Sequence, residues 1–209
     1  MVRNQEFIRQ YRVLHQTGAY GWSSEKLIAR ILPEVLELRP HSILDYGCGQ
    51  SRLVDMLQYD DDVQVFRYDP AIPGIDTLPV QQADLVINTD VMEHVPEEDV
   101  DDVLDEISRI SDRAIFNIAT APARCILPNG QNAHCTVRPA DWWQARLQRH
   151  FDCVEGLPTS RPTKCMFKTW ESVPSKWLLK KWWGARENVR RRTRQLIGSE
   201  RQHTDRRAV

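Results

Sequence analysis

Residues 42–54 read SILDYGCGQSRLV, and this stretch decides the fold. A short apolar run ends in Asp45, glycines follow at positions 47 and 49, and a helix-compatible segment begins after them. Strands buried on both faces of a parallel sheet are apolar in this way, and glycines after such a strand let the backbone approach a ligand closely. The helix that follows offers unpaired N–H groups, which favour an anionic group. The stretch therefore predicts a strand, a ligand-binding turn and a helix.

The rest of the chain alternates between strand-like and helix-like segments. Short apolar runs predict strands, and apolar residues at helical spacing predict helices. The expected strands cover residues 41–46, 63–69, 83–90 and 113–120, with a final hairpin near 152–157 and 164–172. The expected helices cover residues 23–38, capped by Ser23 or Ser24, and then 51–58, 97–111 and 139–151. This order predicts an α/β fold with a doubly wound, mostly parallel sheet and right-handed crossovers.

The composition fits one intracellular domain with a small addition. The chain has 209 residues, of which 41% are hydrophobic, and a net charge of -1. It lacks a run of about 18 apolar residues and begins with a polar segment, so we expect a cytoplasmic protein without a membrane span or secretory signal. Five cysteines without a C-x-x-C pair indicate reduced thiols. We predict no metal site, because Cys125, His134 and Cys135 lack a fourth ligand at useful spacing.

Charge divides the chain near residue 175. Residues 176–209 carry eleven lysines and arginines against three acidic residues, which leaves a net charge of -9 for residues 1–175. We therefore predict a folded domain over 1–174 and a basic, tryptophan-rich amphipathic tail over 175–209. Three partners for this tail are open: an anionic membrane surface, RNA, or a packed protein surface that is either its own domain or another subunit.

Asp69 and Asp45 indicate the class of ligand. In a doubly wound sheet the ligand crevice lies beyond the carboxyl ends of the strands, and Asp69 ends the second strand, placed to accept ribose hydroxyls. Asp45 would repel a pyrophosphate, but it suits a ligand that carries an ammonium beside a carboxylate. S-adenosylmethionine has such an amino-acid end, whose ammonium would meet Asp45 and whose carboxylate would meet the amides of the loop. The residues therefore predict S-adenosylmethionine as the cofactor.

Three motifs together resemble the seven-strand, Rossmann-like (class I) S-adenosylmethionine-dependent methyltransferases. They are LDYGCGQS (44–51), the acid of VFRYDP (65–70) and ADLVINTDVMEHVPEEDVDDVLDEI (83–107), and the resemblance covers roughly residues 24–172. It implies a seven-stranded sheet, with Gly47 and Gly49 at the methionine end of the cofactor and Asp69 at the ribose. It also implies that the end of the fourth strand of the family, near Thr89, Asp90 and Val91, faces the sulfonium.

One part of the family pattern is hard to see. The usual third strand and its adenine-contacting acid should lie in AIPGIDTLPVQQ (71–82), which does not look like a strand. Asp76 is the candidate substitute for that acid.

Residues 121–143 should select the acceptor, because this connection is too long and polar for a plain turn. Asn129, Gln131, Asn132 and His134 bring together donors and acceptors that suit a polyhydroxylated molecule, although a hydrogen-bonded surface loop is the alternative. The candidates for a catalytic base are His134, His94 and Asp90, and each histidine has a purely structural alternative. Tyr11, Tyr20 and Trp22 form either a lid over the site or a helix packed on the sheet.

These observations predict an enzyme that O-methylates a sugar or glycan-like acceptor in surface polysaccharide synthesis. The tail would then hold the enzyme at the inner face of the membrane, beside lipid-linked glycans. Two other functions are open: an RNA methyltransferase that uses the tail as a nucleic-acid clamp, and a catalytically silent binding module that keeps the fold.

Overall fold

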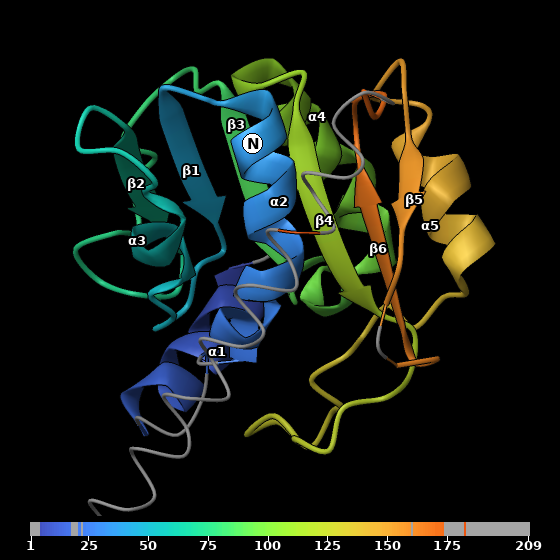
Figure 1. Cartoon of the computed structure of the whole chain (residues 1–209). Helices are drawn as coiled ribbons and strands as arrows, with labels where there is room; N and C mark the ends of the chain where they lie inside the picture. Colours follow the sequence, from blue (N-terminus) through green and yellow to red (C-terminus); the bar gives the residue numbers. More distant parts are fainter. Residues whose placement is uncertain (1–4, 18–20, 22, 160, 174–181, 183–209) are drawn as a thin grey trace, which may run out of the picture.

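The computed structural model describes residues 5–17, 21, 23–159, 161–173 and 182. Its strands form a single sheet in the order β2-β1-β3-β4-β6-β5 (Figure 1). The strands are β1 Ser42–Tyr46, β2 Gln64–Tyr68, β3 Leu85–Thr89, β4 Ala114–Ala119, β5 Glu155–Leu157 and β6 Lys164–Lys168. β1 to β4 run parallel, whereas β6 runs antiparallel to β4 and β5. The predicted α/β sheet and the closing hairpin are therefore confirmed.

The sheet has six strands in the described part of the chain, so the prediction of seven was wrong by one. The missing strand is the one that the sequence made hard to see, between β2 and β3. Turns fill this segment, with the amide of Asp69 donating to the carbonyl of Ile75 at 2.9 Å. Pro70, Pro73 and Pro79 have no N–H to donate to a neighbouring strand, which disfavours pairing here.

Helices cover both faces of the sheet (Figure 1). The α-helices are α1 Gln5–Gln16, α2 Ile28–Leu38, α3 Leu53–Leu57, α4 Val100–Ile110 and α5 Ala140–Leu147. The 3-10 helices are η1 Ser23–Leu27, η2 Met92–His94 and η3 Glu97–Asp99. One apolar cluster packs α2 and α3 against Ile43 and Leu85, and the other packs α4 and α5 against Leu44 and Val86. Adjacent residues of a strand thus point to opposite faces of the sheet, as side chains alternate along a β-strand.

The predicted cap of the first helix was wrong. α2 begins at Ile28 without a side-chain cap, and Ser23 and Ser24 lie in η1. Their hydroxyls instead bond the end of β3: Ser23 donates to Asp90 at 2.7 Å, and Ser24 accepts from Thr89 at 2.8 Å.

A buried lysine ties β6 to α2. The Nζ of Lys168 lies 3.0 Å from Oε2 of Glu34 and 3.8 Å from Oε2 of Glu37, and the lysine side chain is fully buried. Removing one partner of such a buried ion pair leaves an uncompensated charge and typically costs about 3–5 kcal/mol. This cluster therefore fixes the antiparallel end of the sheet to the helix that covers it.

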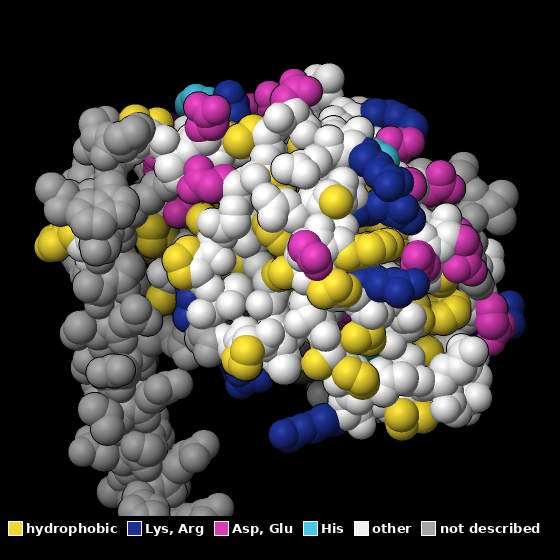
Figure 2. All heavy atoms as spheres, turned by 90° about the vertical axis from the view of Figure 1, so that its right-hand side faces the viewer, with side chains coloured by type: hydrophobic (Ala, Val, Ile, Leu, Met, Phe, Trp, Pro, Cys, Tyr) yellow, Lys and Arg dark blue, Asp and Glu magenta, His cyan; other side chains and the backbone are white. Residues whose placement is uncertain are grey.

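The face around α5 carries both signs of charge (Figure 2). Arg146 lies 2.9 Å from Asp101 across α5 and α4, and His150 bonds Asp101 at 3.1 Å and Asp105 at 2.8 Å. This face therefore lacks the uniform positive potential of a nucleic-acid surface.

Among the described residues, no helix is both long and apolar enough to cross a bilayer. Apart from Trp182, the predicted tail lies outside the described residues, so its membrane, RNA and packing roles stay predictions.

Candidate active site

A cavity of about 590 Å³ opens at the carboxyl ends of β1, β2 and β3. Its walls come from the loop after β1, the turn after β2, the segment from Thr89 to Pro96, one face of α1, and His134. Figure 1 shows α1 lying beneath this edge of the sheet. The cavity therefore occupies the place beside the first strand that the sequence predicted for a ligand.

The loop after β1 requires glycine at two positions. Gly47 has φ +78 and Gly49 has φ +55, both in the left-handed region. A Cβ on residue 47 would lie 2.5 Å from Cγ2 of Val91, and one on residue 49 would lie 3.0 Å from the carbonyl of Gly21. The loop thus packs so closely against its neighbours that a side chain at either position would displace them.

The amides of this loop are bound within the protein, contrary to the expected contact with a ligand carboxylate. Gly47 and Cys48 both donate to the carbonyl of Tyr68, at 2.8 and 3.0 Å. The amide of Gly49 donates to Asp69 at 2.9 Å, and that of Gln50 to Gly21 at 3.1 Å. A bound carboxylate would therefore depend on side chains.

Asp69 lines the cavity in a fixed orientation. Its Oδ2 accepts from the amide of Gly49 and its Oδ1 from the amide of Ala71, each at 2.9 Å. The imidazole Nε2 of His15 lies 4.0 Å from Oδ2. Each carboxylate oxygen has more than one lone pair, so two backbone donors leave capacity for hydroxyls. Asp69 is therefore preoriented for the ribose role predicted from the sequence.

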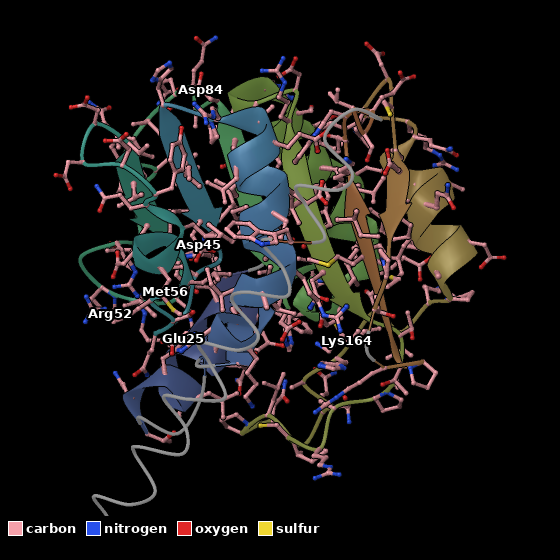
Figure 3. All side chains as sticks on the ribbon, viewed as in Figure 1. Glu25, Asp45, Arg52, Met56, Asp84 and Lys164 are labelled. Carbon is pink, nitrogen blue, oxygen red and sulfur yellow. The ribbon has the colours of Figure 1, made fainter. Side chains whose placement is uncertain are left out.

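Asp45 lies near the carboxyl end of β1 (Figure 3) and does not line the cavity. Its side chain is fully buried, and neither of its oxygens has a hydrogen-bond partner. Burial raises the pKa of Asp45 to about 7, although the charge of Arg67, its neighbour on β2, acts to lower it. The cavity wall therefore does not include the carboxylate that was expected to contact a ligand ammonium directly.

Thr89 is the last residue of β3 and Asp90 follows it, and both line the cavity. Asp90 has φ +58, and it accepts hydrogen bonds from Ser23, from Asn117 and from Nζ of Lys164. These three donors hold its carboxylate in place, so Asp90 suits a positioning role better than that of a base. Figure 3 shows Lys164 at this edge of the sheet.

Asp76, the candidate adenine-contacting acid, does not line the cavity. It is 42% exposed and lies 3.9 Å from Arg12 of α1.

The two histidines predicted as bases meet in the cavity. The ring centroids of His94 and His134 are 4.9 Å apart. Nδ1 of His94 bonds the carbonyl of Ala133 at 2.8 Å, and Nδ1 of His134 bonds the carbonyl of Ala121 at 2.6 Å. A carbonyl only accepts, so both Nδ1 atoms carry the proton and both Nε2 atoms carry the lone pair.

Both imidazoles are neutral at neutral pH. Burial lowers the pKa of His94 to about 4, and desolvation also lowers the pKa of the half-exposed His134. Each ring therefore has a nitrogen lone pair, and both residues line the cavity.

Sequence reasoning assigned no role to Glu93, which lines the cavity. Glu93 is fully buried: Oε1 accepts from the amide of Ala119 at 2.9 Å, and Oε2 has no hydrogen-bond partner. Burial and the neighbouring Asp90 raise the pKa of Glu93 to about 8. The sequence signal was its position directly before His94.

Tyr11 was considered only for a lid, yet its hydroxyl donates to Ala133 at 2.5 Å and lies 3.0 Å from Nδ1 of His94. α1 therefore forms a wall of the cavity, while Tyr20 and Trp22 lie outside the described residues.

No model of a known protein family and no curated protein sequence matches the chain. Solved structures do match it. The methyltransferase domain of bacterial CtHen1 is 12% identical, with a TM-score of 0.53 over 69% of this chain and 97% of that one. The 1,6-didemethyltoxoflavin N1-methyltransferase of Burkholderia thailandensis, solved with S-adenosylhomocysteine, is 11% identical, with a TM-score of 0.53 over 82% and 92%.

The mitomycin 7-O-methyltransferase is 13% identical, with a TM-score of 0.50 over 69% of this chain and 53% of that one. Each of these matches covers more than two thirds of this chain. The chain therefore has the fold of the class I S-adenosylmethionine-dependent methyltransferases.

Proposed function

We propose that the protein is an S-adenosylmethionine-dependent methyltransferase that methylates a hydroxyl group of a small molecule. The observation that supports this proposal is that a single cavity is lined by two sets of residues, one suited to a nucleoside and the other to a proton. One half holds the glycine loop and Asp69, which suit a nucleoside. The other half holds His94 and His134, which suit the handling of a proton.

The donor half fits S-adenosylmethionine in four respects. Gly47 and Gly49 line the cavity and carry no side chains, so the ligand can lie against the backbone of the loop. Asp69 is preoriented for the ribose hydroxyls. Lys26 lines the cavity and is the cation suited to the methionine carboxylate, since the loop amides are already bound. When ionised, Asp45 adds a negative charge near the loop that favours the cationic parts of the donor.

The acceptor half must align an oxygen with the methyl carbon and remove its proton. When bound, S-adenosylmethionine supplies a methyl carbon that its positively charged sulfur has already activated. Alignment is the larger part of the task, and one base suffices for a hydroxyl. His134 suits this role because it is neutral, carries its lone pair at Nε2 and is only partly buried. One proton would move from the hydroxyl to His134 for each methyl group transferred.

The acceptor wall favours a molecule with an apolar face. Phe7 and Ile8 of α1 line the cavity together with Val95, Pro96 and Val103. Aromatic and aliphatic side chains bind flat apolar surfaces, and the histidines supply the polar contact. Two of the matching structures are named for methyltransferases of mitomycin and of didemethyltoxoflavin, which also supports a small acceptor.

The main argument for a sugar or glycan acceptor was the set of polar side chains between residues 129 and 134, and most of this set does not line the cavity. Asn129 and Gln131 bond each other at 3.0 Å on the surface, and Asn132 bonds Ala123 within the loop. Of the four polar side chains expected to recognise the acceptor, His134 alone lines the cavity. The glycan pathway, the RNA alternative and the cytoplasmic location stay predictions without structural support.

Titration calorimetry with S-adenosylmethionine and S-adenosylhomocysteine tests the donor half. We expect micromolar binding by the parent. Asp69→Asn should bind about tenfold more weakly or worse, because a lost charged hydrogen bond is worth about 1.5–3 kcal/mol. Equal affinity in parent and variant would refute the ribose assignment, and circular dichroism would check that the variant is folded.

Methyl transfer from labelled donor to a panel of phenols, sugars, nucleotides and RNA tests the acceptor half. His134→Ala should lose about 10²-fold in turnover on any accepted substrate, with donor affinity unchanged. Full turnover in this variant would remove His134 from the reaction. Binding of the donor without transfer to any class would favour the silent binding module.

A further inference from the structure

The cavity contains a cluster of metal-ligating side chains that donor binding does not use. Glu93, His94 and His134 each offer one ligand atom, and these atoms all lie within 4.8 Å of one another. All three residues line the cavity. Ligand atoms on one cation lie at most two bond lengths apart, about 4.2 Å, so side-chain adjustments of under about 1 Å would complete the site.

The hydrogen bonds around the histidines orient them as metal ligands. Each Nδ1–H donates to a backbone carbonyl, that of Ala133 for His94 and that of Ala121 for His134. Metal-binding histidines almost always donate their second ring N–H in this way, which fixes the tautomer and keeps the other nitrogen basic. Both Nε2 lone pairs are therefore set by contacts that do not involve a ligand.

Glu93 provides an independent observation. Its carboxylate is fully buried, one oxygen accepts from the backbone of Ala119, and the other has no hydrogen-bond partner. A buried carboxylate oxygen without a partner is costly unless a cation or a donor completes it. The charge of Lys164 acts on all three residues of the cluster, but its ammonium is paired with the carboxylate of Asp90 at 2.5 Å.

We propose that Glu93, His94 and His134 bind a divalent transition-metal cation at the acceptor end of the cavity. Two imidazoles and one carboxylate form a set that suits Mn²⁺, Co²⁺ or Zn²⁺ rather than Mg²⁺ or Ca²⁺, which prefer oxygen ligands. Three protein ligands leave positions open for an oxygen of the acceptor.

This inference rests on the proposed function for its role in the reaction. The cation would lower the pKa of the bound acceptor hydroxyl, whose proton would then pass to water. The acceptor oxygen forms the bond to the methyl carbon as the carbon–sulfur bond breaks. With the cation bound, His134 would hold the acceptor through the metal instead of taking the proton itself.

Cobalt binding to the untagged, metal-stripped full chain tests the site without any methyl transfer. Titration with Co²⁺ should give visible d–d absorption that saturates at one ion per chain. His134→Ala, in a partly exposed loop, and Glu93→Gln, close to the parent in shape, should each weaken binding by about tenfold or more. His41→Ala changes an exposed histidine outside the cavity and should bind as the parent does.

The outcomes separate the metal site from the methyltransferase proposal. Absence of Co²⁺ binding by the parent, or equal binding by His134→Ala and Glu93→Gln, would overturn the metal site, whatever the donor does. Binding that is lost in these two variants and kept in His41→Ala would support it. A calorimetric titration of S-adenosylhomocysteine on the same samples tests the donor site on its own, since Asp69 and the glycine loop are not metal ligands.

Discussion

Replacing Asp45 with asparagine should stabilise the protein, and the gain should depend on pH. The Asp45 carboxyl is fully buried without a hydrogen-bond partner, and burial raises its pKa from 3.8 to about 7. In the unfolded chain the group ionises near its ordinary pKa. Between these two values the folded protein keeps a proton that the unfolded protein has lost, so folding stability falls as the pH rises.

The magnitude follows from the size of the shift. One pKa unit corresponds to about 1.36 kcal/mol, so a shift to about 7 costs up to about 4 kcal/mol once the pH exceeds the folded pKa. The cost is absent below the unfolded pKa and complete above pH 7. Asparagine has similar shape and no charge, so the Asp45→Asn variant escapes this loss. For a chain of this length the difference corresponds to a rise in Tm on the order of 10 °C.

Thermal unfolding at pH 5 and at pH 8.5, followed by circular dichroism, measures the effect. The difference in Tm between Asp45→Asn and the parent should already be a few degrees at pH 5, which lies above the unfolded pKa of 3.8, and should grow by several degrees more at pH 8.5. Asp61→Asn makes the same chemical change at an exposed position and should show no such growth. A Tm difference that is the same at both pH values would refute the reasoning, because it would mean that Asp45 does not titrate in this window. The same variant should bind S-adenosylmethionine more weakly at pH 8.5, since it lacks the charge near the loop.

Three further substitutions test the packing and the walls of the cavity. Gly47→Ala should lower the free energy of unfolding by about 1–3 kcal/mol and weaken donor binding, because the added Cβ would meet Val91 and φ at this position is +78. Gly156→Ala, the control, adds its Cβ in open space and should change the urea midpoint little. Lys168→Met should lower the free energy of unfolding in urea by about 3–5 kcal/mol, and a loss below about 1 kcal/mol would show that the buried carboxylates relax without it. Tyr11→Phe removes the hydroxyl bond to Ala133 and should reduce turnover on the acceptor while leaving calorimetric donor affinity unchanged; an equal loss of both would place Tyr11 at the donor.

Local patterns in the sequence were enough to predict the sheet and the edge that carries the site. The run that ends in Asp45 and the acid at the end of β2 both depend on neighbours in the chain, and both lie where they were expected. The proline-rich segment after β2 also signalled the missing strand. The strand was still predicted, because the family resemblance implied a seven-stranded sheet.

Long-range contacts were beyond the reach of the sequence. Ser23 looked like a helix cap, but its hydroxyl bonds Asp90, 67 positions away in the chain. His94 and His134 were separate candidates until the fold brought their rings together. Tyr11 meets Ala133 across 122 positions, and neither spacing nor composition encodes that contact. Residue types and local spacing therefore predicted which side chains carry chemistry, whereas their partners required the fold.

The central claim is that the cavity at the carboxyl edge of the sheet holds S-adenosylmethionine, with its ribose on Asp69. A crystal structure of the full chain with S-adenosylhomocysteine tests this claim most directly. We expect the product in the cavity, with its ribose hydroxyls within hydrogen-bond distance of Asp69 and its amino-acid end against the loop of Gly47 and Gly49. A cavity that stays empty at saturating product, or a product bound with its ribose away from Asp69, would contradict the account.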